Sequence, residues 1–200
     1  MEKIEKRILL DGDIQMRAVE EEGGKRYLEG YAAIFNSRSK LILEKGEIFY
    51  EELRQGSFTQ VLSNPKLDVY YTLNHERGRV MGRTTNGTLQ LKEDETGLSF
   101  RVELPNNVSY ANDVYELVKR GDLFNMSFAF AVDSEGFKWE RTDEGIPLRV
   151  INNVRRLVDV SVVTLPAYEE TTVQARDLPI FEEKPKQDNI QERMKMKLKI

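Results

Sequence analysis

Hydrophobic and polar residues alternate along much of the chain up to residue 165, in short runs separated by turn residues. Residues 15–20 and 26–35 alternate in this way, and Glu22-Gly23-Gly24-Lys25 joins them as a predicted hairpin. Further β-rich segments are predicted strands, among them residues 67–75, 98–104, 123–132 and 157–165. A period of two places successive side chains on opposite faces of a sheet, so the pattern predicts a mainly β fold with a few α-helices.

One segment, residues 109–119, has the helical period instead. Its apolar residues form a single stripe, Ala111, Val114, Tyr115 and Val118. Gly121 follows a basic last turn, as is typical of a helix C-terminus. The end of this predicted helix therefore determines where the strand over residues 123–132 begins.

The composition changes at Asp177. Residues 177–200 carry two of the six prolines and alternating charges, and they end in a basic and apolar stretch. We expect residues 1–176 to form one β-rich domain and residues 177–200 to form a flexible or partly helical C-terminal tail. The functional alternative for the tail is a peptide that docks on a partner.

Composition and charge exclude several classes of protein. No apolar run approaches the ~20 residues that a membrane-spanning helix needs. A chain without cysteine has no thiolate nucleophile and no Cys-based zinc site, which favours a cytoplasmic setting. The net charge of −4 argues against nucleic acid as the main partner. With a single histidine, His75, a metal-ligand set is incomplete, so we expect neither a metal nor a cofactor.

Ser127 lies in the predicted strand over residues 123–132. The alternation places Met126 and Phe128 on one face, and Ser127 with Ala129 on the other. The large side chains can fill a core, while the small neighbours leave room for a ligand beside the hydroxyl. The alternative is that Ser127 fills a crowded strand position and bonds the backbone.

Asp159 is the polar exception in residues 157–165. Burying an unpaired carboxylate costs several kcal/mol, so a partner is expected. One candidate partner is an arginine: Arg101, Arg155 or Arg156. The other is an imidazole N–H, because a carboxylate there fixes the tautomer and stabilises the imidazolium.

His75 ends the predicted strand over residues 67–75, on the face of Tyr71 and Leu73. A structural or surface role is the alternative to catalysis. Taken together, however, Ser127, His75 and Asp159 supply a hydroxyl, a base to remove its proton and a carboxylate to orient that base. We therefore predict that these three side chains contact one another in a row. The sequence has no G-x-S-x-G nucleophile elbow and no H-E-x-x-H motif.

Several stretches, in this order, resemble the prohead (procapsid maturation) proteases of tailed bacteriophages. The clearest are Gly30-Tyr31-Ala32-Ala33-Ile34-Phe35-Asn36, Leu73-Asn74-His75-Glu76, Met126-Ser127-Phe128-Ala129-Phe130 and Asp159-Val160-Ser161-Val162-Val163-Thr164-Leu165-Pro166-Ala167-Tyr168. The resemblance spans about residues 26–176. It implies that His75 is the general base, Ser127 the nucleophile and Asp159 the third member, where most of that family have glutamate. The family is similar in fold to the herpesvirus assemblins, which implies an assemblin-like closed or nearly closed β-barrel with peripheral helices.

The resemblance also implies a function. The protein would be a serine endopeptidase that cleaves scaffold and capsid-protein segments, and itself, during phage procapsid maturation. Its partners would be the major capsid protein and its scaffold segment, inside the assembling procapsid in the bacterial host cytoplasm; self-association is left open. The alternative from another class is a non-catalytic internal scaffold or capsid-assembly module with the same barrel.

The resemblance supplies no oxyanion donors. We expect backbone N–H groups near Ser127 first, and the side chains of Arg155 and Arg156 second.

Overall fold

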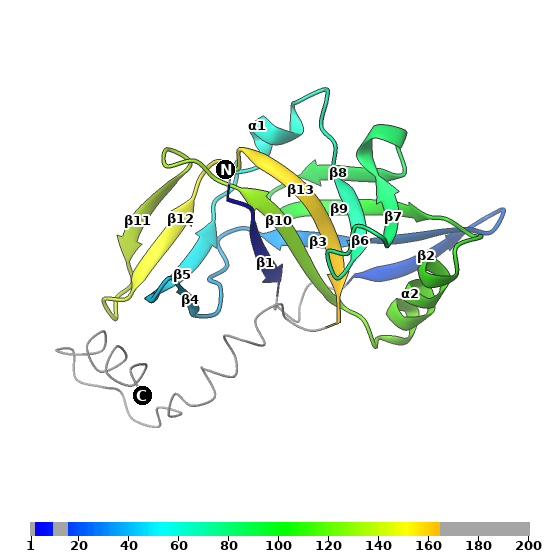
Figure 1. The fold of residues 1–200 in the computed structure, drawn as a ribbon, viewed down its shortest axis with the longest axis horizontal. Coiled ribbons are helices and arrows are strands. Elements are labelled where there is room, and N and C mark those ends of the chain that lie inside the picture. Colours follow the sequence, from blue (N-terminus) through cyan, green and yellow to red (C-terminus); the bar gives the residue numbers. More distant parts are fainter. Residues whose placement is uncertain (1–2, 10–15, 165–200) are drawn as a thin grey trace.

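The computed structural model describes residues 3–9 and 16–164, and these residues form three β-sheets and two α-helices (Figure 1). The mainly β fold with a few helices is confirmed. The boundary expected at residue 176 and the tail over residues 177–200 lie outside the described residues. In the described ranges, neither helix has the length and apolar character that crossing a bilayer requires.

The sheet that carries the candidate residues has five strands in the order β1-β10-β13-β6-β7. Its strands are β1 (Glu5–Leu9), β10 (Asn125–Ala131), β13 (Arg156–Val163), β6 (Tyr70–Leu73) and β7 (Val80–Arg83). β10 pairs antiparallel with β1 on one side and with β13 on the other, and β13 runs parallel to β6. Segments far apart in the sequence are therefore direct neighbours here.

The second sheet has the order β2-β3-β9-β8 and lies against the first. Its strands are β2 (Arg17–Glu21), β3 (Lys25–Ile34), β9 (Gly97–Leu104) and β8 (Leu89–Glu93). The predicted hairpin at Gly23-Gly24 joins β2 to β3, with both glycines at positive φ. β1 and β10 contact β3, and β7 contacts β9, so the two sheets form two layers.

The third sheet has the order β11-β12-β5-β4 and lies at one end of the molecule (Figure 1). Its strands are β11 (Phe137–Arg141), β12 (Pro147–Ile151), β5 (Glu47–Leu53) and β4 (Ile42–Glu44). β12 and β5 are parallel. A bridge between Phe35 and Leu53 connects this sheet to the end of β3.

The closed or nearly closed barrel is not confirmed. In the described residues, each of the three sheets has an open strand order that starts and ends at different strands. The apolar faces are buried by packing one sheet on another, so no sheet has to close on itself. The assemblin-like part of the expectation therefore has no support in this architecture.

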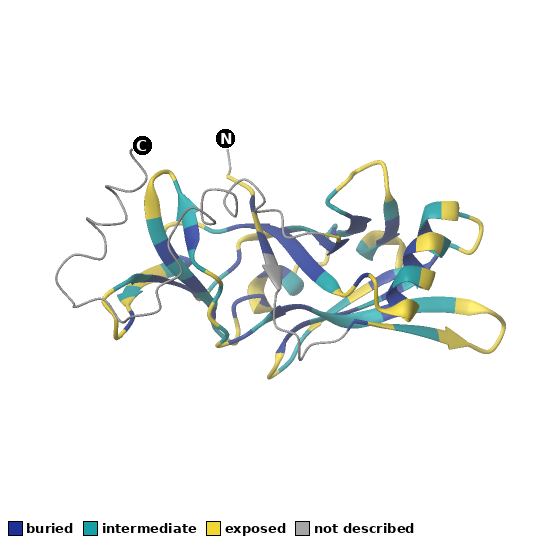
Figure 2. Ribbon diagram, turned by 90° about the horizontal axis from the view of Figure 1, so that it is seen from below, coloured by how far each residue is buried: buried dark blue, intermediate teal, exposed yellow. Residues whose placement is uncertain are grey.

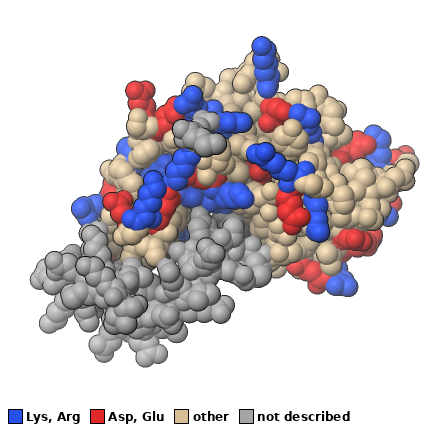
Figure 3. Space-filling model, viewed as in Figure 1, with Lys and Arg blue, Asp and Glu red and all other residues tan. Residues whose placement is uncertain are grey.

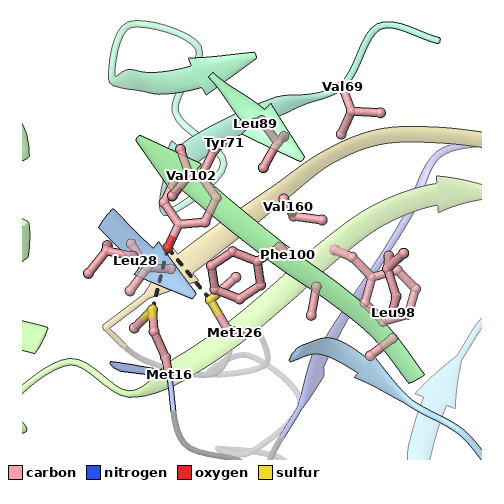
Figure 4. Packing of buried hydrophobic residues seen from close by; sticks show 14 of the residues in the cluster. Met16, Leu28, Val69, Tyr71, Leu89, Leu98, Phe100, Val102, Met126 and Val160 are labelled. Atoms are coloured by element: carbon pink, nitrogen blue, oxygen red, sulfur yellow. Dashed lines mark hydrogen bonds between the residues drawn. The ribbon is translucent and has the colours of Figure 1, made fainter. Parts of the chain in front are cut away.

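The core between the first two sheets is built from large apolar side chains (Figure 4). Tyr71 of β6 packs on Phe100 of β9, with ring centroids 5.3 Å apart. Its hydroxyl lies 3.4 Å from the Met16 sulfur and 3.9 Å from that of Met126. Met126 of β10 thus turns its side chain into the core, as the alternation predicts, and fixes the orientation of the strand that carries Ser127.

The helices are peripheral. α2 (Ser109–Arg120) packs its predicted stripe against β2, β3 and β9 and exposes its other side (Figure 2). Gly121, with φ of 86°, ends it, and β10 begins four residues later. The short α1 (Thr59–Leu62) and a 3-10 turn, η1 (Thr84–Asn86), complete the described elements. Charged side chains of both signs are interspersed over the face seen in Figure 3.

Candidate active site

The structure brings His75, Ser127 and Asp159 together. His75 Nε2 lies 2.7 Å from Ser127 Oγ, and His75 Nδ1 lies 2.5 Å from Asp159 Oδ1. Both distances are those of hydrogen bonds. The imidazole therefore stands between the hydroxyl and the carboxylate, and the aspartate reaches it directly.

His75 lies in a turn and not in a strand. The alternation of residues 67–75 predicts that His75 ends a strand on the face of Tyr71 and Leu73, but β6 ends at Leu73. Asn74 and His75 both have positive φ, 54° and 59°, and the Glu76 N–H donates to the Leu73 carbonyl at 2.9 Å. Two consecutive residues at positive φ are the mark of a type I′ turn, and asparagine and histidine are among the residues that tolerate this region. The turn folds the imidazole back over β13 and β10.

Asn74 holds this turn against β13. Its N–H donates to the Val162 carbonyl at 2.9 Å, and its side-chain Oδ1 accepts the Thr164 N–H at 3.0 Å. These bonds fix the backbone on which the imidazole is carried. The orientation of His75 therefore depends on a neighbour that makes no contact with Ser127 in the described interactions.

Ser127 is fully buried in the middle of β10, between β1 and β13. Its hydroxyl has two neighbours, the His75 imidazole and the backbone carbonyl of Arg7 in β1, which accepts from it at 2.9 Å. A hydroxyl has a single proton, so it donates to one of these two acceptors at a time. With Ser127 fully buried, the room for a ligand that the small neighbours suggest is not open beside the hydroxyl in this structure.

Asp159 is partnered by His75 and by a second hydroxyl that the sequence analysis missed. The Ser161 hydroxyl donates to Asp159 Oδ1 at 2.8 Å and lies 3.2 Å from His75 Nδ1. Ser161 in turn lies 2.6 Å from Thr72 Oγ1 of β6. Two polar residues separated by one position share a face of a strand, so the spacing of Asp159 and Ser161 was the signal that could have identified Ser161.

Arg155 and Arg156, the second expectation for the oxyanion donors, lie near the end of β10 that is away from Ser127. Both Arg155 and Arg156 are exposed, whereas the Ser127 hydroxyl is buried. Arg155 pairs with Asp133 at 2.8 Å, and Arg156 stands opposite Ala131, four residues along β10 from Ser127. At about 3.4 Å per residue, the backbone position opposite Arg156 is about 14 Å along β10 from that of Ser127. Of the partners expected for Asp159, the imidazole is the one found at its carboxylate.

The site is largely buried. The side chains of His75 and Asp159 are 3% and 14% exposed, and Ser127 is 0% exposed. Within residues 3–9 and 16–164, no group of three or more His, Asp and Glu side chains is placed to hold a metal ion. The arrangement can move a proton from a hydroxyl to an imidazole that a carboxylate orients, which is the requirement for nucleophilic catalysis by serine.

Comparison with known proteins points to one family. The profile of the family described as "Caudovirus prohead serine protease" matches residues 12–184. The prohead protease of Enterobacteria phage HK97 is 28% identical over 155 residues, which cover 77% of this chain and 61% of that protein. This chain therefore spans less than two thirds of the length of that relative. The solved structure of the bacteriophage T4 capsid assembly protease aligns with a TM-score of 0.47 and 11% identity, over 81% of this chain and 99% of that one.

Proposed function

We propose, because this chain belongs to the Caudovirus prohead serine protease family, that it is a serine endopeptidase of phage procapsid maturation. Ser127 is the nucleophile, His75 the general base and Asp159 the residue that orients the base. The observation that carries the proposal is the continuous hydrogen-bonded row from Ser127 Oγ through His75 to Asp159 Oδ1, with spacings of 2.7 and 2.5 Å. Family membership supports protease chemistry, and the geometry supports these three roles.

The proposed reaction begins at the His75 Nε2 lone pair. With the Nδ1 proton held by Asp159, Nε2 removes the Ser127 proton while Oγ bonds to the carbonyl carbon of the scissile peptide. The tetrahedral intermediate collapses when the imidazolium protonates the leaving amine, which leaves an acyl-enzyme on Ser127. Water then attacks the ester, His75 takes its proton, and the acid product leaves as Oγ recovers a proton.

The oxyanion of that intermediate needs hydrogen-bond donors. Neither Arg155 nor Arg156 lies at the hydroxyl. β10 is an interior strand whose backbone groups pair with β1 on one side and β13 on the other. We assign the role to backbone N–H groups of the β10 segment around Ser127, which would become available on the β1 side when that strand is displaced.

The substrates are proposed from the family and from the relatives. The prohead protease of phage HK97 is named for the prohead. We assign to this chain the cleavage of scaffold and capsid-protein segments, and of itself, inside the assembling procapsid of the host cell. The major capsid protein and its scaffold segment are the partners on this proposal. Self-association and a docking role for residues 177–200 remain hypotheses that rest on the sequence alone.

Active-site labelling tests the proposal. A fluorophosphonate is incubated with the native full chain for hours, because Ser127 is buried and the site must open before it reacts. We expect modification at Ser127 in the native protein, none after heat denaturation, and none in Ser127→Ala. The matched control is Ser99→Ala, which removes a hydroxyl that donates to the Lys92 backbone carbonyl in the other sheet.

Cleavage of co-expressed capsid and scaffold protein is the second measurement. Ser127→Ala and His75→Ala are expected to lower the rate by roughly 10⁴–10⁶ while the circular dichroism spectrum stays that of the parent. A Ser127→Ala protein that cleaves at the parent rate would show that the chain is a non-catalytic assembly module or that the nucleophile lies elsewhere.

A further inference from the structure

A strand of this chain, β1, lies against the Ser127 hydroxyl in the closed site. Ser127 needs contact with a peptide carbonyl to react, yet it is fully buried. The carbonyl that meets its hydroxyl already belongs to this chain, at Arg7 of β1, 2.9 Å away. β1 thus fills the position that an incoming peptide would have to take.

β1 fills this position as an added edge strand. It pairs antiparallel with β10 from Glu5 opposite Phe130 to Leu9 opposite Met126, which places Ile8 opposite Ser127. It is the terminal strand of its sheet, next to β10 in Figure 1. Addition of an extended segment to a sheet edge is a common way of binding peptides, in which backbone bonds give affinity and alternate side chains give specificity.

The alternate side chains of β1 are held by the third sheet. Arg7 Nε lies 2.6 Å from Glu51 Oε1 of β5, and Arg149 Nη1 of β12 lies 2.6 Å from Glu5 Oε2. Arg7 and Glu5 also contact each other at 2.7 Å. All four residues are buried. Glu51 and Arg149 therefore form a two-part binding position, called the seat below. Glu51 binds a basic residue of the strand, and Arg149 binds an acidic residue two positions earlier.

The seat is charge-balanced without β1. Glu51 Oε2 and Arg149 Nη1 are already 3.2 Å apart, so departure of Glu5 and Arg7 together leaves these two buried side chains facing each other. Glu44, whose carboxylate lies 3.8 Å from Arg7, is partly exposed and can be solvated. A buried charge left alone is strongly unfavourable, whereas a remaining pair is compensated. The cluster is thus compatible with a strand that leaves and is replaced.

The contact between the Ser127 hydroxyl and the Arg7 carbonyl would also inhibit the reaction. The hydroxyl proton that Arg7 carbonyl oxygen accepts is the proton that His75 must remove. While β1 is in place, the carbonyl competes with the base for it. β1 thereby lies where a substrate would lie, but its Arg7 carbonyl draws the hydroxyl proton away from His75.

We propose that the β10 edge with Glu51 and Arg149 is the substrate-binding site, and that β1 occupies it as a pseudosubstrate strand. The ligand class is an extended peptide that pairs antiparallel with β10 and presents an acidic residue, any residue and then a basic residue to the seat. This inference rests on the proposed protease function. Glu51 and Arg149 are then specificity-determining residues, and activity requires displacement of β1.

The test weakens the attachment of β1 in the full chain. Glu5→Ala combined with Arg7→Ala removes both anchors and leaves the Glu51–Arg149 pair intact. We expect fluorophosphonate labelling of Ser127 to become about tenfold faster or more, because a larger fraction of molecules has an open site. Glu5→Arg combined with Arg7→Glu exchanges the two charges at constant composition and should accelerate labelling as well. Lys25→Ala combined with Glu103→Ala, which removes an exposed ion pair of the second sheet, is the matched control and should label at the parent rate.

A peptide added in solution tests the seat directly. A capped peptide of sequence Glu-Lys-Arg-Ile-Leu should slow the labelling of the Glu5→Ala/Arg7→Ala protein, and the charge-exchanged peptide Arg-Lys-Glu-Ile-Leu should not. Equal labelling rates in the parent and both double variants, with Ser127→Ala unlabelled, would overturn the pseudosubstrate strand and leave the protease function standing. If hydrogen exchange shows β1 released in a double variant while Ser127 stays unlabelled, the protease function itself fails, and this inference with it.

Discussion

Ser161 stands directly opposite Ser127 in the register of β10 and β13, and the two serines lie on the two sides of the same imidazole. Ser127 meets His75 at Nε2, whereas Ser161 lies near Nδ1 and donates to Asp159. On the proposed mechanism, Ser127 is the serine that reacts, and Ser161 holds the carboxylate that orients the base. This division of roles makes Ser161 a positioning residue that can be tested separately.

Ser161→Ala is expected to slow Ser127 labelling and substrate cleavage by about 5–30-fold, because loss of one hydrogen bond to a carboxylate is worth about 1–2 kcal/mol. Thr72→Val, which removes a group one step further from the base, should have a smaller effect. The measurement is the labelling rate of folded protein, with circular dichroism as the check on folding. Equal loss of stability in both variants with unchanged labelling would assign Ser161 a purely structural role.

Asp159→Asn should lower the cleavage rate by about 10³–10⁴, since an amide cannot hold the imidazole in the required tautomer and cannot stabilise its cation. Asp159→Glu should keep most of the activity, because it retains the carboxylate and is the residue that the resemblance implies for most of the family. Cleavage of capsid protein by the two variants, expressed at equal level, makes the comparison. A glutamate variant as inactive as the asparagine variant would mean that the 2.5 Å contact tolerates no longer side chain.

The sequence predicts the individual helices, strands and turns near this site better than it predicts how they pair and pack with one another. The α2 stripe, the β2–β3 hairpin and the alternation of Met126 and Ser127 follow from spacing alone, because they depend on neighbours in the chain. The contact of Ser127, His75 and Asp159 was expected from residue chemistry and family resemblance together. The turn at Asn74 and His75 was missed, since residues 67–75 alternate to their end and the positive φ values come from bonds to β13.

The pairing of strands that are far apart in the chain does not follow from the alternation of hydrophobic and polar residues. Nothing in the alternation of residues 4–9 shows that this strand would pair with β10 and cover Ser127. The same holds for Glu5 and Arg7, which look like ordinary surface charges until β5 and β12 supply Glu51 and Arg149. The barrel was expected from analogy with assemblins, and the apolar faces are buried by layering instead.

Gly97→Ala is expected to lower the free energy of unfolding by about 2–4 kcal/mol, because the added Cβ would lie 2.0 Å from the Ala33 carbonyl oxygen. The contact is with backbone at an irregularity of the β3–β9 pairing, so no side chain can rotate away. Gly78→Ala is the matched control, since its Cβ meets nothing within 4 Å and should change stability by less than about 1 kcal/mol. Urea unfolding of both variants tests the difference, and similar stabilities would show that β3 and β9 can separate at little cost.

The attachment of β1 should depend on pH through Glu5. Burial by itself would raise the pKa of its carboxyl, but the hydrogen bond from Arg149 and the charge of Arg7 outweigh burial, so the pKa lies below its usual value of 4.5. A carboxyl whose pKa is lowered by folding stabilises the folded state above its unfolded pKa, and that contribution is lost as the pH falls through the folded value. Lys3 faces Glu5 as a further cation, and Glu51 shares both arginines with it.

Glu5→Gln isolates this contribution, because the amide has nearly the shape of the acid and no charge. At pH 7 the variant should be less stable than the parent by about 1–3 kcal/mol. The gap should narrow as the pH falls below 4.5, because Glu5 of the unfolded parent then binds a proton, and it should close once the pH lies below the lowered pKa of Glu5 in the folded parent. Glu103→Gln, in an exposed pair with Lys25, should differ from the parent by less than about 1 kcal/mol at any of these pH values. A gap between the parent and Glu5→Gln that is the same at pH 7 and pH 3 would mean that the charge of Glu5 does not hold β1 against β5 and β12.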